Sequence, residues 1–439
     1  MLDKLYKSGL NQIFVAIVLE VMKKYKLNVE TTHLDSSSFH VHGQYETVKT
    51  GELEEPKVIN ITYGYSRDHR PDLKQFVMDL ICTSDGDVPL WMRTGSGNES
   101  DQKQFAKAMI DFKKQLRLDS LMVADSAFYT QENIGNLKNM RWISRVPLTV
   151  KNAKKLVSEI ESDQFTKSQL TGYSYLEVKN NYGGIEQRWV VVESEKRRES
   201  DLKVMEKRIE KDWQLALKKI GELRNREFAC VTDAEKAAVR SLRKVKYHEI
   251  TKVKIKANDS KISPKKSKKP NYKVEEVIIA VCLENVERDR KQAGRFILAT
   301  NVLDRQNLAS EEILSKYKDQ QSVERGFSFL KDPMFLTDSV FLKSNTRIES
   351  LGLIMGLCLL VYTLGQRELR QTLKRTKTGV KNQLGKLTNR PTLRWIFQCF
   401  QSIHVLATQG AKQISNLTKE RLELLEFFPV SCQRYYLLV

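Results

Sequence analysis

The sequence predicts an α/β fold in which a mixed β-sheet is flanked by helices. Apolar residues alternate or run continuously at 30–43, 75–83 and 121–124, as in strands. Apolar residues recur at helical spacing over 1–28 and 101–117. The short buried run after a meander of longer strands is typical of a sheet that has a parallel pair beside antiparallel strands.

The charge of the chain indicates a polyanionic partner. The 439 residues include 74 basic and 54 acidic side chains, for a formal net charge of +20. Nucleic acid is the usual partner of such a surface, and a merely soluble basic protein is the alternative. The six cysteines form no CxxC pair, which argues against a zinc module or a disulfide framework and favours a reducing cytoplasm.

The longest apolar run, 351–365, predicts a buried core helix. It is shorter than the ~18–20 residues that span a bilayer, and no signal peptide opens the chain. We therefore expect no membrane partner.

Asp35 is the first candidate metal ligand. It lies inside the strand expected at 30–43, where a carboxylate is costly unless it is paired, metal-bound or at the strand end. A turn aspartate is the alternative. His33, His40 and His42 are weak evidence for zinc, and they could line the same groove as Asp35.

The chain then predicts a second strand at 57–64, a basic turn at 64–75 and a hairpin arm at 88–97. The turn carries Arg67 and Arg70, which we interpret either as DNA contacts or as solvated loop residues.

Asp125 is the second candidate. It ends the buried strand 121–124, just before a helix for which Thr130 is a plausible N-cap. A carboxylate at the carboxyl end of a strand, before a helix, is a usual place for chemistry in an open α/β sheet. A strand at 141–147 closes this half of the sequence.

Residues 148–294 interrupt the core pattern. A hairpin is expected at 173–194, turned at Tyr182-Gly183-Gly184, followed by a charged helical segment at 195–246 and strands at 246–257 and 273–283. A lysine-rich loop at 252–273 suits phosphate contacts or simply solubilises the chain. Its candidate DNA contacts are Lys265, Lys266, Lys268 and Lys269.

The stretch 317–331 predicts one helix with two different faces. Val323, Phe327 and Leu330 recur at core spacing. Four polar residues fall in a sector about 60° wide on another face: Tyr317, Gln320, Glu324 and Lys331. That face could hold a metal and grip a phosphate, and a solvated amphipathic helix is the alternative.

This stretch resembles the signature helix of insertion-sequence transposases of the RNase H-like DDE superfamily. The group concerned is marked by Tyr, two residues, Arg, three residues, Glu, six residues and Lys (YREK), and Gln320 departs from it at the Arg position. The resemblance implies an RNase H-like mixed sheet with a long β-rich insertion between the second Asp and the Glu. Glu324 follows Asp125 by 199 residues, which fits.

The resemblance implies that Asp35, Asp125 and Glu324 form the catalytic, metal-binding triad. Phosphodiester chemistry of this kind uses two divalent ions about 3.5–4 Å apart, here Mg²⁺, for which Mn²⁺ can substitute. Lys331, Tyr317, Gln320 and Arg325 would contact DNA. Phe296, at the start of the last core strand, could stack on a base, although core packing is favoured.

The implied reaction is cleavage at the ends of an insertion sequence, followed by strand transfer into target DNA. The partner is double-stranded DNA, bound by a homodimer in a paired-end complex, in a bacterial-type cytoplasm at the nucleoid. The expected domains are an N-terminal helix, two parts of the catalytic core around an insertion domain, and a C-terminal helical region: 1–28, 29–147, 148–294, 295–376 and 377–439.

Only 34 residues precede Asp35, so we expect an N-terminally truncated copy that has lost most of its end-recognition region. Two alternatives follow. One is a catalytically inactive, DNA-binding remnant of a transposase. The other is an unrelated RNase H-like nuclease.

Overall fold

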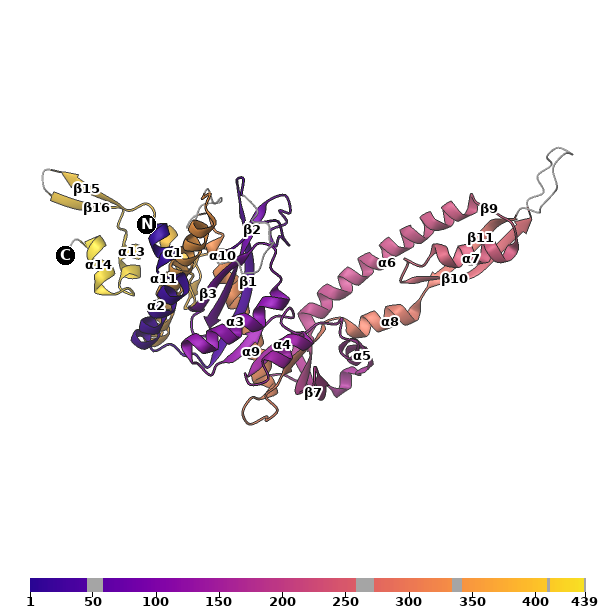
Figure 1. Ribbon diagram of the computed structural model, residues 1–439, viewed down its shortest axis with the longest axis horizontal. Coiled ribbons are helices and arrows are strands. Elements are labelled where there is room, and N and C mark those ends of the chain that lie inside the picture. The colour runs from indigo at the N-terminus through magenta and orange to yellow at the C-terminus, as the bar shows by residue number, and fades with distance from the viewer. Residues whose placement is uncertain (46–57, 258–271, 334–341, 409–410, 438–439) are drawn as a thin grey trace. The chain divides into compact units, whose positions relative to one another are not determined.

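The computed structural model describes residues 1–45, 58–257, 272–333, 342–408 and 411–437 (Figure 1). These residues form two compact units. The first unit consists of Met1–Ser144, Asn181–Gln187 and Thr300–Val439, and the second of Arg145–Asn180 and Arg188–Ala299. Asp35, Asp125 and Glu324 all belong to the first unit.

The first unit is built on a mixed sheet with the strand order β3-β2-β1-β4-β5. The strands are β1 (Thr31–Val41), β2 (Lys74–Thr83), β3 (Pro89–Ser96), β4 (Leu121–Ala124) and β5 (Trp142–Val146). β1, β2 and β3 pair antiparallel, whereas β4 is parallel to both β1 and β5. The mixed sheet expected from the sequence is confirmed.

Both faces of this sheet are covered, because nearly every residue of β2 and all of β4 are buried. Four helices pack against its strands: α2 (Leu10–Tyr25), α3 (Asp101–Leu116), α10 (Gln321–Leu330) and α11 (Asn345–Thr376). The short helix α4 (Gln131–Asn136) begins as expected, since the Thr130 hydroxyl accepts a hydrogen bond from the Asn133 amide at 3.2 Å.

Two expected elements near the N-terminus are wrong. The single helix over 1–28 is divided into α1 (Leu2–Lys7) and α2, because Gly9 has a φ of 81°, which ends a right-handed helix. In place of a strand over 57–64, the described residues contribute one isolated bridge, between Thr62 and Gln75.

The second unit contains the strands β12 (Arg295–Thr300), β8 (Ile185–Ser194), β7 (Tyr173–Tyr182) and β6 (Thr166–Lys167), in this order. The β7–β8 hairpin is confirmed, and its turn residues Gly183 and Gly184 have φ values of 63° and 77°. Three short helices complete this part: α5 (Lys151–Glu159), α8 (Leu283–Gln292) and the 3₁₀ turn Ser162–Gln164.

The charged segment 195–246 forms two helices, α6 (Glu195–Arg224) and α7 (Val231–Ser241), around the short strand β9 (Glu227–Phe228). They pack on β10 (His248–Ala257) and β11 (Tyr272–Val281). A small separate core joins them, with Ile220, Phe228, Ala234 and Val274 buried in it. The expected loop 252–273 is strand at both ends, and its lysines 265, 266, 268 and 269 lie outside the described residues.

Helix α11 runs for 32 residues and contains the apolar run 351–365 that was expected to form a core helix. Within the described residues it alone is long and apolar enough to cross a membrane by length and composition. However, 56% of its apolar window is buried. It packs on β3, α1 and α2, as a core helix does.

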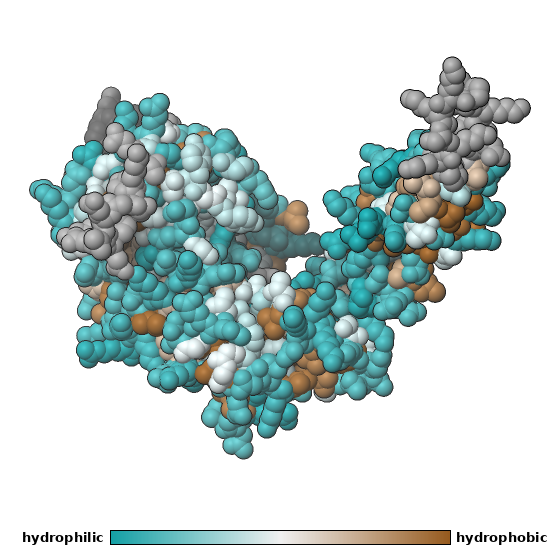
Figure 2. All heavy atoms as spheres, turned by 45° about the vertical axis from the view of Figure 1, so that its right-hand side comes forward, coloured by the Kyte–Doolittle hydropathy of each residue, from teal (hydrophilic) through white to brown (hydrophobic). Residues whose placement is uncertain are grey.

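The C-terminal part of the first unit packs on the end of α11. Leu369 and Leu373 of α11 share a buried cluster with Leu393 and Ile396 of α12 (Leu393–Phe400). The other elements are α9 (Ser310–Asp319), the pairs β13–β14 (Val380–Lys381, Leu387–Thr388) and β15–β16 (His404–Thr408, Ala411–Ser415), α13 (Lys419–Leu425) and α14 (Val430–Leu437). In Figure 2 the visible face of the molecule is mainly hydrophilic, with hydrophobic side chains in separate groups.

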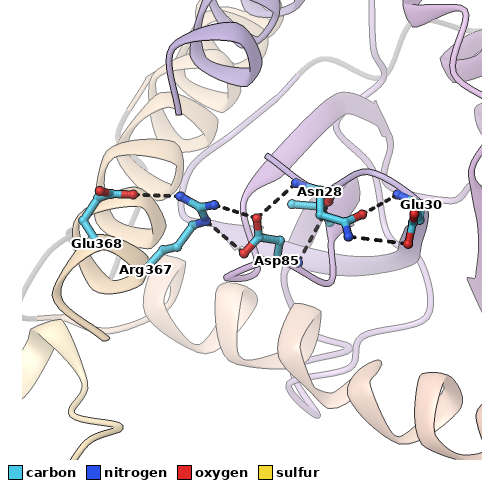
Figure 3. A network of polar contacts seen from close by, with 6 residues as sticks. Asn28, Glu30, Asp85, Arg367 and Glu368 are labelled. Atoms are coloured by element: carbon cyan, nitrogen blue, oxygen red, sulfur yellow. Dashed lines mark hydrogen bonds and ion pairs between the residues drawn. The ribbon is translucent and has the colours of Figure 1, made fainter. Parts of the chain in front are cut away.

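An ion pair ties α11 to the turn between β2 and β3 (Figure 3). Arg367, which is 7% exposed, donates two hydrogen bonds to Asp85, at 2.9 and 2.7 Å. Asp85 also accepts from the Asn28 amide at 3.0 Å, so one carboxylate joins α11, the turn and the start of β1. Burial alone would raise the pKa of Asp85, but the hydrogen bonds from Arg367 and Asn28 outweigh it and lower the pKa.

We predict that Arg367→Ala lowers the free energy of unfolding by about 2–3 kcal/mol, because it leaves Asp85 partly buried without its cation. Urea unfolding at neutral pH measures the change. Arg375→Ala, at an exposed position of the same helix, is the matched control and changes stability little. Equal losses in the two variants would contradict the anchoring role of Arg367.

Candidate active site

The parallel register of β1 and β4 places Asp35 beside Asp125. Thr31 of β1 pairs with Leu121 of β4, and the pairing continues to Leu34 and Ala124. The next residue after each of these last two is an aspartate. Residues in register on neighbouring parallel strands point to the same face of a sheet. β4 ends there while β1 continues to Val41, so the two carboxylates lie where the sheet opens.

The surroundings of Asp35 disfavour the charged form of its carboxylate. Its side chain is 17% exposed, and Oδ1 accepts one hydrogen bond from the Ser36 amide at 2.8 Å. Burial is the main reason that its pKa is raised to about 7. The Ser36 hydrogen bond and the charge of Arg67 lower this pKa, and the charges of Asp125 and Glu324 raise it.

Asp125 is held by its backbone and its neighbours. Its Oδ1 accepts from the Ala127 amide at 2.9 Å, and its backbone carbonyl accepts from the Ser144 hydroxyl at 2.8 Å. Burial raises its pKa, and repulsion from Asp101 adds to this rise. Two neighbouring carboxyls with raised pKa values indicate a site with uncompensated negative charge.

The expected single helix over 317–331 is wrong. The run is divided into α9 and α10 at Gln320, which is 8% exposed, and α10 ends at Leu330. Tyr317 and Glu324 therefore lie on different helices, and Lys331 caps the second one. Gln320 itself keeps right-handed helical angles, with φ −56° and ψ −27°. The hydrogen bonds on either side of it span three residues, from the Gln320 amide to the Tyr317 carbonyl at 3.2 Å and from the Val323 amide to the Gln320 carbonyl at 3.1 Å.

Glu324 lies in the first turn of α10 and is exposed. Another face of α10 carries the expected core residues Val323, Phe327 and Leu330, all buried. The Phe327 ring lies 6.4 Å from the ring of Phe39 on β1, centroid to centroid. Packing of α10 on β1 thus brings Glu324 close enough for its charge to raise the pKa of Asp35.

These three carboxylates suit a divalent cation by their chemistry. Hard oxygen donors are the ligands that Mg²⁺ takes, and Asp35 and Asp125 carry charge that burial makes unfavourable. Among the described residues, however, no three His, Cys, Asp or Glu side chains are close enough together to hold a metal. The two aspartates provide a preformed pair, and Glu324 stands apart from them at an exposed position.

Residues of the 64–75 turn contact this region. Arg67 lies 3.9 Å from Asp35 and forms a hydrogen-bonded ion pair with Asp101. The next residue, Asp68, accepts two hydrogen bonds from Lys331 Nζ, at 2.8 and 2.9 Å. The turn therefore engages both the first candidate ligand and the candidate phosphate-binding lysine.

The other predicted DNA contacts are placed differently. Tyr317 is half-buried in α9, and Arg70 is exposed and paired with Asp72 at 2.8 Å. Arg325 is exposed and lines a cavity of about 200 Å³ that Arg370 and Arg394 also line. Phe296 lies in β12 of the second unit. It is 8% exposed, with the guanidinium groups of Arg145 and Arg197 at 5.6 and 5.8 Å from its ring.

The histidines do not form a zinc site in the described part of the chain. His33 is fully buried, and its Nε2 lies 2.9 Å from the Ser84 hydroxyl. Burial lowers the pKa of His33 to about 4, so the ring is neutral. His40 and His42 contact each other, with ring centroids 5.6 Å apart.

A cavity of about 420 Å³ adjoins the candidate site. Its walls come from β1 (Ser36 and Ser38), the turn (Tyr65 and Arg67), and the start of α3. Sequence reasoning missed the roles of Asp68, Asp101 and these serines. The three serines after Asp35 were a usable signal, because a polar run inside a buried strand predicts a groove. The pairing of Asp68 with Lys331, 263 residues apart, had no local signal.

Comparison with known proteins shows which protein family the chain resembles. The family described as "Transposase DDE domain" matches residues 30–364. No curated protein matches. A piggyBac transposase synaptic complex with hairpin DNA aligns with 76% of this chain and 46% of that chain, at 9% identity and a TM-score of 0.35. A Mos1 transposase paired-end complex with the left transposon end aligns with 30% and 40%, at 10% identity and a TM-score of 0.18.

The chain thus spans less than half the length of these transposases. The match to the family, by contrast, extends over most of this sequence and includes Asp35, Asp125 and Glu324. The chain belongs to the transposase DDE domain family.

Proposed function

We propose that this chain is a DNA transposase of the YREK group that cleaves DNA at insertion-sequence ends and transfers the freed 3′ ends into target DNA. The observation that carries the proposal is the placement of Asp35 beside Asp125 at the end of β4, with Glu324 in electrostatic reach. The match to the transposase family adds the class of reaction.

The contrast between two buried carboxylates supports a functional role for Asp35. Asp79, on the neighbouring strand β2, receives hydrogen bonds from Arg93 at 2.9 and 2.6 Å. Asp35 has Arg67 only at 3.9 Å, and that guanidinium is hydrogen-bonded to Asp101 instead. A structural carboxylate is paired closely with its cation. Among the described residues, the carboxylate of Asp35 has no cation within hydrogen-bonding distance, and it accepts a hydrogen bond from the Ser36 amide.

In the proposed reaction, Asp35, Asp125 and Glu324 would hold two Mg²⁺ ions, for which Mn²⁺ could substitute. The chemistry supplied by such ions would be activation of the attacking oxygen and stabilisation of the leaving one. Lys331 binds a phosphate next to the scissile bond, helped by Tyr317. The basic residues of the turn and of the insertion contact the DNA backbone without reading sequence. Double-stranded DNA is the partner, and a homodimer holds the paired ends.

A second candidate function is DNA binding without cleavage. The exposed position of Glu324, and the absence of a three-ligand group among the described residues, favour it. In that case the basic surface binds DNA through its phosphates with a steep salt dependence, and added metal changes nothing.

We predict that the wild-type protein nicks supercoiled plasmid carrying the ends of its own element, in Mg²⁺ or Mn²⁺, and that Glu324→Gln loses this product at least 100-fold. The substitution keeps the size of the side chain and removes the charge that holds the cation. Nicked and joined products are measured on agarose gels.

Glu20→Gln, at an exposed position of α2, makes the same chemical change away from the site and keeps full activity. Equal activity in wild type and Glu324→Gln would remove Glu324 from the catalytic set. DNA binding without any metal-dependent product, in all three proteins, would favour the second candidate function.

We further predict that Asp35→Asn stabilises the metal-free protein at pH 8. The unfolded chain releases this proton near pH 3.8, whereas the folded protein keeps it up to about pH 7. The folded state therefore binds the proton more tightly, so its stability falls as pH rises through this window. The neutral amide removes that loss, and the melting temperature in EDTA rises at pH 8 relative to wild type.

Asp79→Asn is the matched control. Burial raises the pKa of Asp79 as well, but Arg93 donates two hydrogen bonds to its carboxylate at 2.9 and 2.6 Å, so the loss of this buried ion pair lowers the melting temperature. Addition of Mn²⁺ stabilises the wild type above pH 7 and has little effect on Asp35→Asn. Destabilisation by Asp35→Asn at pH 8 would show that Asp35 is a structural carboxylate like Asp79.

A further inference from the structure

We propose that Lys331 and His40 form a binding site for a DNA phosphate, and that the carboxylate of Asp68 occupies this site until DNA displaces it. The inference rests on the proposed function, because it takes DNA as the ligand. It adds His40 to the phosphate contacts and assigns a role to the 64–75 turn: its tip competes with the substrate.

The contact between Lys331 and Asp68 has the chemistry of a phosphate contact. Lys331 Nζ donates to both oxygens of Asp68, at 2.8 and 2.9 Å, as an ammonium group does to a phosphate. His40 Nδ1 lies 3.8 Å from the same carboxylate, beyond hydrogen-bond distance. This nitrogen is buried and has no hydrogen-bond partner among the described residues. A phosphate is larger than a carboxylate and carries more acceptor oxygens, so it suits both groups.

The proposed phosphate site lies on the same elements as the candidate metal ligands. His40 lies on β1, five residues beyond Asp35, and its side chain projects from the other face of the strand. Lys331 follows α10, seven residues beyond Glu324, and its ammonium group lies 5.3 Å from the centre of the Phe39 ring. The same strand and the same helix thus carry the candidate metal ligands and the anion site.

Arg67, the residue before Asp68, carries the opposite charge. The Arg67 guanidinium lies 3.9 Å from Asp35, one of the two candidate metal-binding aspartates. Adjacent residues therefore present a cation to the candidate metal ligands and an anion to the candidate phosphate site. Arg67 and Asp68 thus carry charges of the same signs as a metal ion at the carboxylates and a phosphate at Lys331.

The turn is held differently at its base and at its tip. Its base is fixed by backbone packing, because a Cβ at Gly64 would lie 1.9 Å from the Gly97 carbonyl oxygen. The Gln75 side chain also donates to the Gly97 carbonyl at 2.8 Å. The tip, by contrast, is held to the rest of the unit by the side chains of Arg67 and Asp68 and by the Arg67 amide, which donates to the Ser38 hydroxyl at 3.2 Å. His69, at the tip, has a φ of 56° and is exposed.

The test measures the affinity of purified full-length protein for a short DNA duplex of arbitrary sequence, in EDTA, by fluorescence anisotropy. Asp68→Asn removes the competing charge and keeps the shape. We expect it to bind DNA several-fold more tightly than wild type. The slope of log affinity against log salt concentration steepens by about one unit, because one more phosphate is neutralised.

Asp72→Asn is the matched control. Asp72 lies in the same turn, is exposed, and pairs with Arg70 and not with Lys331. It makes the same change in net charge and frees Arg70, another candidate DNA contact of the turn, so it reports the effect of releasing an exposed cation. The double variant Asp68→Asn/Lys331→Gln is expected to lose the gain, and Asp68→Asn/His40→Ala to lose part of it. Equal affinity and equal salt slopes for Asp68→Asn and Asp72→Asn would overturn the proposal.

Failure of the Asp68 proposal can be distinguished from failure of the proposed transposase function. Binding in EDTA requires no cleavage, so a protein without nicking activity still reports on the anion site. Conversely, a catalytic wild type in which Asp68→Asn and Asp72→Asn bind alike keeps the transposase function and loses the Asp68 inference. Melting curves of all variants confirm that each is folded before its affinity is compared.

Discussion

The parallel pairing of β1 with β4 is the constraint on which the candidate site depends. Hydrogen bonds between these strands end at Leu34 and Ala124, and the two aspartates follow in register. A shift of one residue in either strand would send one carboxylate to the other face of the sheet. The buried side chains of β4 and the antiparallel partner β2 hold this register, so the core of the first unit determines the spacing of the acidic pair.

Opposing charges around that pair explain the rest of the site. Burial makes the charged form of Asp35 unfavourable, and Arg67 compensates only partly from 3.9 Å. Lys331, Asp68 and Arg67 form contacts across elements that lie far apart in the chain. Each pair satisfies charges that would otherwise lie half-buried. The same contacts hold the 64–75 turn next to the candidate site. A change in the charges of the site would therefore also change the position of the turn.

Much of this arrangement could be predicted from local patterns. The strands at 31–41 and 121–124, the Thr130 cap and the Gly183-Gly184 turn each follow from residues within a few positions of one another. The break at Gln320 could not be predicted, because the apolar spacing of Val323 and Phe327 continues the helical pattern across it. Nor could the Asp68–Lys331 pair, which depends on tertiary packing. The roles of Asp35, Asp125 and Glu324 stay predictions from resemblance.

The division of the first unit along the chain has a consequence for its synthesis. Asp35 and Asp125 leave the ribosome early, whereas Glu324 follows Asp125 by 199 residues, most of which belong to the second unit. At typical elongation rates of 5–20 residues per second, this delay lasts roughly 10–40 s. The proposed site is complete only after residue 324 has been made, so a nascent chain that ends before Glu324 lacks one of the three candidate metal ligands.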